Sequence, residues 1–208
     1  GSNLPTGRNH GPVDPMFFAS CAKPGGPMTP LRWHPAALQT ALTLPLLLLL
    51  GSRAAGRDIA VPQDFPVIQS ALDHAQNGDR VLVGPGTYKE TLNFNGRNIT
   101  LLSTAGPQVT RLDPENRRGI ELGPKGAVIG LTITNAFGDF GGAIAVHGTG
   151  SIIRSNIFDH CVESGGGFGA AIGGNSASPV IEANVFQYCV ADDQFLSGVI
   201  GFVNTSSP

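Results

Sequence analysis

Four acidic side chains in the second half of the chain could together bind a cation. They are Asp139, Glu163, Asp192 and Asp193, and each lies between a strand pair containing Ile and Phe and a following strand of the Gly-Ala-Ile type. If these units stack, the intervening loops meet on one flank. Clustered carboxylates on loops bind Ca²⁺, which takes about six to eight oxygen ligands. The sequence therefore predicts a calcium site on this flank, and the alternative is an ordinary solvated loop edge.

A second set of side chains could act on a bound ligand. His160 and Tyr188 are 28 residues apart, and they are candidates for an acid/base and for a partner that stacks on a sugar. The alternative is that both are simply exposed side chains on a coil. The basic cluster of the chain consists of Arg111, Arg117, Arg118 and Lys125. A charged loop is the simpler interpretation of this cluster.

A repeat of 28 residues predicts the elements that must position these side chains. The tripeptides 142–144 (GAI), 170–172 (AAI) and 198–200 (GVI) follow one another at this interval. With the same spacing, Ile153, Asn156, Phe158 and Cys161 recur as Ile181, Asn184, Phe186 and Cys189. Segments so short and so often broken by Gly and Asn are strands rather than helices. Three short strands per unit, each pairing with its equivalent in the next unit, predict a parallel β-helix.

Stacked coils place equivalent residues above one another at about 4.8 Å. Interior ladders are expected for Ile144, Ile172 and Ile200, and for Phe158 and Phe186. Asn156 over Asn184 is expected at a tight turn, with the left-handed backbone that Asn tolerates and an amide hydrogen bond between coils. An earlier, shorter coil fits at a step of 25 through Val128, Leu131, Ile133 and Ala136. Leu131 replaces the Asn there, so the amide ladder should begin one coil later.

Cys161 and Cys189 should also be vertical neighbours. The Cα separation of stacked strands lies within the range of a disulfide, but strands in register hold the Cβ atoms farther apart than a disulfide prefers. We therefore expect two packed thiols rather than a disulfide, in spite of the export signal described below.

Composition and charge exclude several functions. The 208 residues are 41% hydrophobic and 13% charged, with 29 Gly and a net charge of −2, which suits a solenoid made of turns and short strands. From residue 126 onward, six acids face one base, Arg154. This balance argues against nucleic acid and against unaided binding of a polyanionic sugar. The sequence also contains no P-loop, dinucleotide fingerprint, nucleophile elbow or zinc spacing.

The beginning of the chain is typical of an exported protein. Residues 1–27 are rich in Gly and Pro and are interpreted as a disordered or non-native leader. Residues 28–54 have a basic start, a short apolar core and a small-residue exit, which predicts a secretory signal peptide and a mature chain from about Ala55. A membrane anchor is the alternative, although the apolar core is short. The protein is expected to be extracellular or periplasmic, secreted or at the cell surface, without a stable membrane span after cleavage.

The mature chain, 55–208, is expected to open with an amphipathic helix. Asp64 can cap a helix at about 64–76 in which Val67, Ile68, Ala71, Leu72 and Ala75 share one face, and coils follow from about 80 to 208. The segments 64–72 (DFPVIQSAL), 78–83 (GDRVLV) and 85–90 (PGTYKE) resemble the amino-terminal cap and first coil of secreted right-handed parallel β-helix proteins of the pectin-lyase-like superfamily. The resemblance extends from about residue 59 to the end, and in those families the helix covers the open first coil.

This resemblance implies a protein that acts on, or binds, a cell-wall or matrix polysaccharide, with lyase or hydrolase chemistry if it is catalytic. In polysaccharide lyases, Ca²⁺ bridges acids of the enzyme to an acidic sugar and an Arg or Lys serves as the base, which would assign these roles to the acids above and to Arg117 or Arg118. The signature segments of pectin methylesterases and alginate epimerases are absent. The end resembles the start of another coil, so downstream coils of the same chain are expected to continue the helix and to hold part of an active site. A non-catalytic surface or adhesion repeat is the alternative function.

Overall fold

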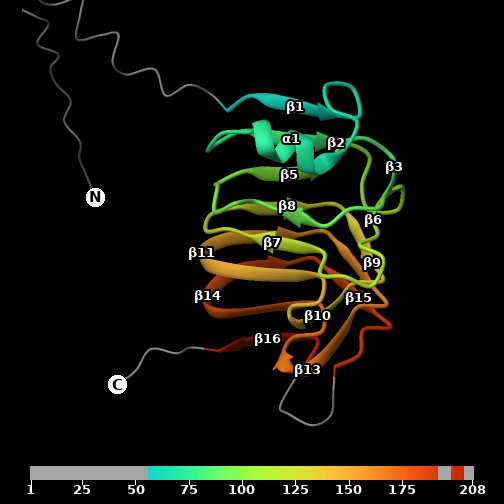
Figure 1. Cartoon of the computed structure of the whole chain (residues 1–208), viewed down its shortest axis with the longest axis vertical. Coiled ribbons are helices and arrows are strands. Elements are labelled where there is room, and N and C mark those ends of the chain that lie inside the picture. The colour runs from blue at the N-terminus through green and yellow to red at the C-terminus, as the bar shows by residue number, and fades with distance from the viewer. Residues whose placement is uncertain (1–55, 192–197, 204–208) are drawn as a thin grey trace, which may run out of the picture. The chain divides into compact units, whose positions relative to one another are not determined.

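The computed structural model describes residues 56–191 and 198–203, which are coloured in Figure 1. The predicted leader, the predicted signal peptide and two calcium candidates, Asp192 and Asp193, lie outside these residues. Within the described part of the chain, no helix is both long and apolar enough to cross a membrane.

The described chain consists of short strands and one helix. The strands of the first coils are β1 (Asp58–Val61), β2 (Arg80–Val83), β3 (Gly86–Tyr88), β4 (Leu92–Asn93), β5 (Thr100–Ser103), β6 (Thr110–Leu112) and β7 (Ile120–Leu122). The later strands are β8 (Ala127–Ile129), β9 (Thr132–Thr134), β10 (Phe137–Phe140), β11 (Ile144–Arg154), β12 (Ile157–Asp159), β13 (Val162–Phe168), β14 (Ile172–Glu182), β15 (Val185–Gln187) and β16 (Ile200–Val203). The helix α1 (Ile68–His74) lies between β1 and β2.

The strands stack as the rungs of a parallel β-helix of about six turns. Every strand pairing is parallel, and each pairs with the equivalent strand of the next coil, in the order β1-β2-β5-β8-β11-β14-β16 on one path and β3-β6-β9-β12-β15 in a second sheet. Figure 1 shows this stack running from β1 at the top to β16 at the bottom. The fold class predicted from the repeat is therefore confirmed.

The predicted interior ladders are present. Ile144 pairs with Ile172 and Ile172 with Ile200, and the first two side chains are fully buried. Ile200 is 40% exposed because β16 is the last described strand of its sheet. The rings of Phe158 and Phe186 stack with centroids 4.9 Å apart and planes inclined by 7°. These ladders bury the apolar stripe of each coil against its neighbours, which is the main stabilising contribution in a stacked repeat.

The asparagine ladder forms, but the turn beside it is built differently from the prediction. Asn156 donates from Nδ2 to Asn184 Oδ1 at 3.1 Å, as expected. The left-handed backbone, however, belongs to the preceding residues, Ser155 and Ala183, with φ of 55° and 54°. Asn156 itself points inward and is 1% exposed. Its side-chain amide stabilises the turn, because it forms hydrogen bonds with backbone groups that have no strand partner at this bend.

The helix α1 covers the first coil, as predicted. It is shorter than the predicted range of about 64–76, because it begins at Ile68 and ends at His74, and two further details of the prediction are wrong. It buries Ile68, Ala71 and Leu72 against β1, β2 and β4, while Val67 stays largely exposed at the N-cap. Asp64 does not cap the helix, because its carboxylate accepts from the backbone N–H of Ala60 at 2.7 Å.

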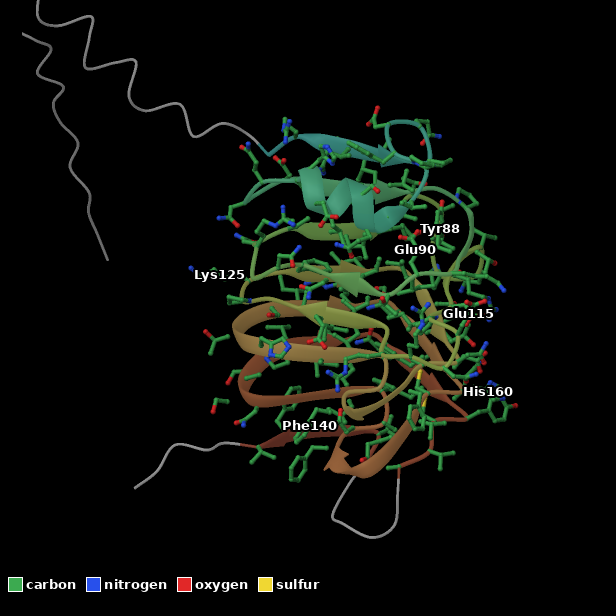
Figure 2. The ribbon with its side chains drawn as sticks, viewed as in Figure 1. Tyr88, Glu90, Glu115, Lys125, Phe140 and His160 are labelled. Carbon is green, nitrogen blue, oxygen red and sulfur yellow. The ribbon has the colours of Figure 1, made fainter. Side chains whose placement is uncertain are left out.

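Glu90 performs the capping function, and it reaches the helix from the following coil (Figure 2). Its two oxygens accept from the N–H groups of Ile68 and Gln69, both at 2.9 Å. A carboxylate in this position satisfies orphan donors and complements the positive end of the helix. The cap therefore also ties the helix to the stack of coils.

Asp79 lies just beyond the C-terminal end of the helix and accepts hydrogen bonds from the backbone there. These contacts should make the stability of the protein depend on pH. Its carboxylate is buried and accepts from the N–H groups of Gln76 at 2.9 Å and Arg57 at 2.8 Å, and from the Arg57 guanidinium at 2.8 Å. These hydrogen bonds, led by that of Gln76, lower the pKa of Asp79 from 3.8 to about 2. Since the folded pKa is the lower one, the stabilisation is complete above the unfolded value and is lost as pH falls through about 2.

We therefore expect Asp79→Asn to lower the free energy of unfolding by about 2 kcal/mol at pH 6, because it weakens the hydrogen bonds that this buried carboxylate accepts. The difference from wild type should shrink between pH 5 and pH 2, measured by urea unfolding. The control is Asp58→Asn, which removes the exposed partner of Arg80 and should have a much smaller effect. A difference between wild type and Asp79→Asn that does not change with pH would contradict this assignment.

Candidate functional site

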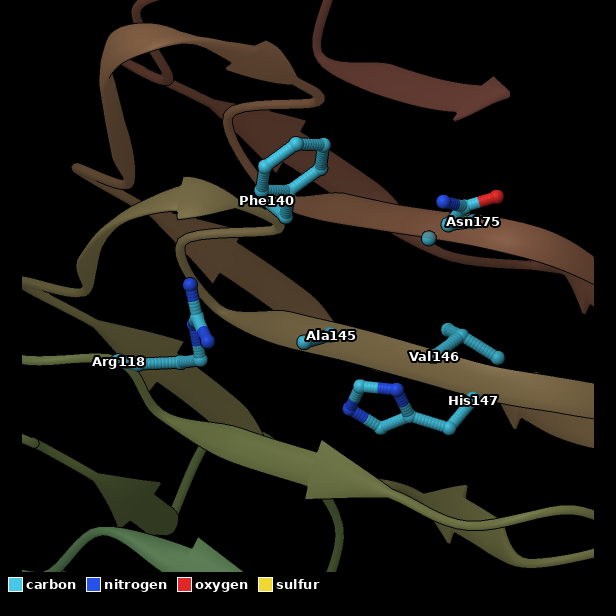
Figure 3. Close-up of a pocket in the computed structure, with 7 residues that line it drawn as sticks. Arg118, Phe140, Ala145, Val146, His147 and Asn175 are labelled. Atoms are coloured by element: carbon cyan, nitrogen blue, oxygen red, sulfur yellow. The ribbon is translucent and has the colours of Figure 1, made fainter. Parts of the chain in front are cut away.

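A hollow of about 260 Å³ lies on the outer face of the sheet that contains β7, β11 and β14 (Figure 3). Its lining residues are Arg118, Phe140, Ala145, Val146, His147, Gly174 and Asn175. The volume is close to the lower limit of ligand pockets, which suits one small ring. We refer to it as the Phe140 hollow.

The strand alternation explains why these side chains face outward. In β7, Ile120 and Leu122 point into the core, so Glu121 between them points out. The register of β11 places Ala145 beside Glu121, and His147 two residues further pairs with Asn175 of β14. Because Ala145 has only a methyl side chain, it leaves space above the strand at the base of the hollow.

Phe140 and Arg118 come from segments outside this sheet. Phe140 ends β10 and contacts Phe168 of β13, with ring centroids 5.9 Å apart. β10 and β13 form a small separate sheet. Each strand is followed by a glycine with a left-handed backbone, Gly141 after β10 and Gly169 after β13, where the backbone turns back towards the main sheet. A Cβ at either glycine would lie about 2 Å from the carbonyl oxygen three residues along the chain, so this return requires glycine.

Arg118 is the electrostatic centre of the site. It lies at the end of the charged loop that precedes β7, as the sequence predicted for this segment. Its Nη1 donates to Glu121 Oε1 at 2.8 Å, and its Nη2 donates to Asp139 Oδ1. Glu121 also contacts His147 Nε2 through its second oxygen, Oε2. Four charged or titratable side chains from three strands and one loop are therefore joined in one network.

The same arginine borders a second hollow of about 280 Å³. This one is lined by Thr91, Leu92, Asn93, Arg117, Arg118 and Glu121. It lies towards β4, so the two hollows follow one another across neighbouring coils, with Arg118 between them. Two adjacent hollows about one ring in size are what a chain of linked rings requires.

The network can carry out chemistry as well as binding. Glu121 and Asp139 each have an oxygen hydrogen-bonded to the same guanidinium, so their carboxylates lie within roughly 8 Å of one another. Glycoside hydrolases hold their two carboxyl groups roughly 5 to 9.5 Å apart. This upper bound is compatible with an acid/base pair for hydrolysis, and the same groups supply donors and acceptors for hydroxyl groups.

The structure brings His160 and Tyr188 together, as predicted, but away from the Phe140 hollow. Their rings stack with centroids 4.9 Å apart, and both residues have a left-handed φ of 53° at the same corner of successive coils. His160 Nδ1 is 2.8 Å from Asp159 Oδ1. Tyr188 is 72% exposed, but one face of its ring is covered by the imidazole. Figure 2 shows His160 at the edge of the stack, away from Phe140, and neither ring lines the hollow.

Of the four predicted calcium ligands, the structure describes two, Asp139 and Glu163. Asp139 and Glu163 lie in strands β10 and β13 rather than in loops, which corrects the prediction. Asp139 pairs with Arg118, and Glu163 is buried with Oε1 accepting from Gly167 N–H at 2.8 Å. Among residues 56–191 and 198–203, no group of three or more His, Cys, Asp and Glu side chains is placed to hold a metal ion. The calcium site stays a prediction that involves Asp192 and Asp193.

The remaining candidates have structural contacts. Arg117 Nε donates to Pro114 O at 3.0 Å, within the charged loop, and the side chain lines the second hollow. Cys161 and Cys189 are free thiols, as expected. Their mutual hydrogen bond, together with burial, raises the pKa of Cys161, while the bond from Cys161 lowers the pKa of Cys189 to about 7.

Sequence reasoning missed Glu121, Phe140 and His147. Glu121 is the polar residue of an Ile-Glu-Leu strand, and His147 is followed 28 residues later by Asn175, so strand alternation and the repeat could have marked both as outward-facing. Phe140 recurs as Phe168 at the same 28-residue step and pairs with it in register, so the repeat could have marked this residue as well. Comparison of the chain with family models, curated proteins and solved structures found no match.

Proposed function

We propose that the protein is a secreted carbohydrate-active or carbohydrate-binding β-helix that acts on a cell-wall or matrix polysaccharide, and that the two hollows beside Arg118 are its binding site. The observation that carries the proposal is the network of Arg118, Glu121, Asp139 and His147 beside the exposed ring of Phe140. Export is proposed from the signal-like segment 28–54.

The chemistry of this network suits a sugar. Each sugar hydroxyl both donates and accepts a hydrogen bond, and carboxylates, a guanidinium and an imidazole supply both kinds of partner. Phe140 is 40% exposed and offers an apolar face for the C–H side of a ring. Two hollows that lie side by side favour a polymeric ligand over a single small molecule.

If the protein is catalytic, hydrolysis is the chemistry that these residues support best. Glu121 and Asp139 would supply the two carboxyl groups, and Arg118 would hold them in place. A calcium-dependent lyase is the less supported mechanism, because Asp139, one of the proposed calcium ligands, is already engaged by Arg118. Such a lyase would depend on residues 192–193.

The alternative proposal is a non-catalytic surface or adhesion module. It is favoured by the ion pairs themselves, since Glu121 contacts both Arg118 and His147. A carboxylate whose two oxygens contact a guanidinium and an imidazole is held in one orientation, which suits binding. Binding of polysaccharide without release of products would select this alternative.

The test replaces the aromatic face of the hollow. Phe140→Ala is expected to weaken binding of the polysaccharide that the wild-type protein retains about tenfold, which corresponds to a loss of about 1.4 kcal/mol of contact. Affinity electrophoresis of the full chain in gels that contain neutral or acidic polysaccharides measures this. Assays for reducing ends and for unsaturated products, with and without Ca²⁺, report any hydrolase or lyase activity.

Phe137→Ala provides the matched control for this experiment. Phe137 belongs to the same strand, is 43% exposed and does not line the hollow, so its replacement should leave the affinity unchanged. Equal losses in both variants would mean that the strand, and not the hollow, is required. No binding of the wild-type chain to any polysaccharide of the panel would refute the proposed function.

A further inference from the structure

The charges around the Phe140 hollow are unevenly distributed. One arginine faces two carboxylates, since Arg118 lies between Glu121 and Asp139. Both terminal nitrogens of the guanidinium already donate to these carboxylates, and Nε is buried. An anionic ligand would therefore meet a cation that is already neutralised, together with the two acids that neutralise it.

The neighbouring residues do not supply the positive charge that would offset this excess of carboxylates. Between residues 126 and 191, the described chain has four acids, Asp139, Asp159, Glu163 and Glu182, and one base. That base, Arg154, is itself paired with Glu182. Arg117 lines the neighbouring hollow rather than this one. Within the described residues, a carboxylate placed against Phe140 has no uncommitted cation lining the same hollow.

We propose that the Phe140 hollow binds an uncharged sugar ring and rejects a uronic acid, so that the polysaccharide is neutral at the residue bound there. This inference rests on the proposed function and specifies its substrate. Hydroxyl groups use the carboxylates as acceptors and the guanidinium and imidazole as donors, so a neutral ring satisfies the network without displacing an ion pair. A uronate carboxylate would have to break one of the pairs and would be repelled by the acid that it releases.

Binding of neutral and uronic acid oligosaccharides of equal length tests this inference. We expect the full wild-type chain, in a buffer with EDTA to exclude bridging by cations, to bind the preferred neutral oligosaccharide at least about tenfold more tightly than the uronic acid series. Titration calorimetry gives both affinities. The affinity for the neutral ligand should change little between 20 mM and 500 mM NaCl, since no ligand charge is screened.

A charge variant makes the test specific. Asp139→Asn removes one of the two acids and the ion pair at Arg118 Nη2, so the ratio of the affinity for the neutral ligand to the affinity for the uronic acid series should fall about tenfold, whatever the variant does to the neutral affinity itself. Glu182→Gln is the matched control, because it removes an acid that pairs with a different arginine, and it should alter neither affinity.

The outcomes separate the two proposals. If the wild-type chain binds uronic acid oligosaccharides as tightly as neutral ones and Phe140→Ala weakens that binding, the selectivity is wrong and the proposed function stands. If uronic acid binding is lost in Arg117→Ala but not in Phe140→Ala, the acid occupies the neighbouring hollow, which agrees with rejection by the Phe140 hollow. If neither class of sugar binds, the proposed function fails and the inference fails with it.

Discussion

Replacement of Asn156 by alanine is expected to lower the free energy of unfolding by about 4 kcal/mol. The side chain is 1% exposed and serves three partners: Oδ1 accepts from Leu131 N–H at 3.0 Å, and Nδ2 donates to Val128 O at 2.9 Å and to Asn184 Oδ1 at 3.1 Å. Alanine would leave a buried N–H and a buried carbonyl in the preceding coil without partners, and each such loss costs about 1 to 3 kcal/mol. Urea unfolding followed by far-UV circular dichroism measures the change.

Two further variants show whether the amide itself is responsible. Asn156→Asp keeps an acceptor for Leu131 but places oxygens against Val128 O and Asn184 Oδ1, so it should be no more stable than the alanine variant at pH 7. Asn184→Ala should cost less, because Asn184 is only half-buried in the last complete coil. A cost below about 1 kcal/mol for Asn156→Ala would show that water replaces the amide.

Phe158→Ala is the second large effect, with an expected loss of about 3 to 5 kcal/mol. The ring is fully buried, pairs in register with Ile133 of the coil before and Phe186 of the coil after, and stacks on Phe186. Its removal leaves a cavity inside a coil that neighbouring strands cannot close, because their hydrogen bonds fix the spacing of the coils at about 4.8 Å. Thermal unfolding monitored by calorimetry gives the change.

Phe186→Ala serves as the control for the position in the stack. Its side chain is partly exposed, and one face packs on Phe158, so we expect about half the loss. Phe158→Leu, which keeps most of the volume, should cost less than about 2 kcal/mol. Equal costs for Phe158→Ala and Phe186→Ala would mean that the described end of the stack is as tightly packed as its middle.

The core and the proposed binding site use different faces of the same strands. The inward residues of β7, Ile120 and Leu122, belong to the core, whereas Glu121 between them belongs to the charged network. Variants of the outward residues should therefore change ligand binding with little change in unfolding. This separation makes the tests of the hollow interpretable, since Phe140 and Asp139 lie outside the buried core.

The parts of the fold that repeat were predictable from the sequence. A fixed step of 28 residues places Ile144 on Ile172 and Phe158 on Phe186, because strands that pair in register bring equivalent residues together. The parallel β-helix, the amide ladder and the contact between His160 and Tyr188 follow from that rule and are confirmed. The covering helix was predicted from its apolar face and the free thiols from the Cβ spacing of stacked strands, and both are present as well.

What occurs once in the chain was decided by the tertiary structure. Glu90 caps a helix that begins 22 residues before it, so Asp64 is not needed for this purpose. Arg118 meets Asp139 across 21 residues, and Glu121 meets His147 across 26. Neither interval matches the 28-residue period, because these contacts depend on where each coil bends and on the extra strand β10. The period determines which residues stack, including Phe140 on Phe168 and His147 on Asn175. The ion pairs that complete the site join residues at other intervals, so their meeting is set by the path of the backbone between the strands.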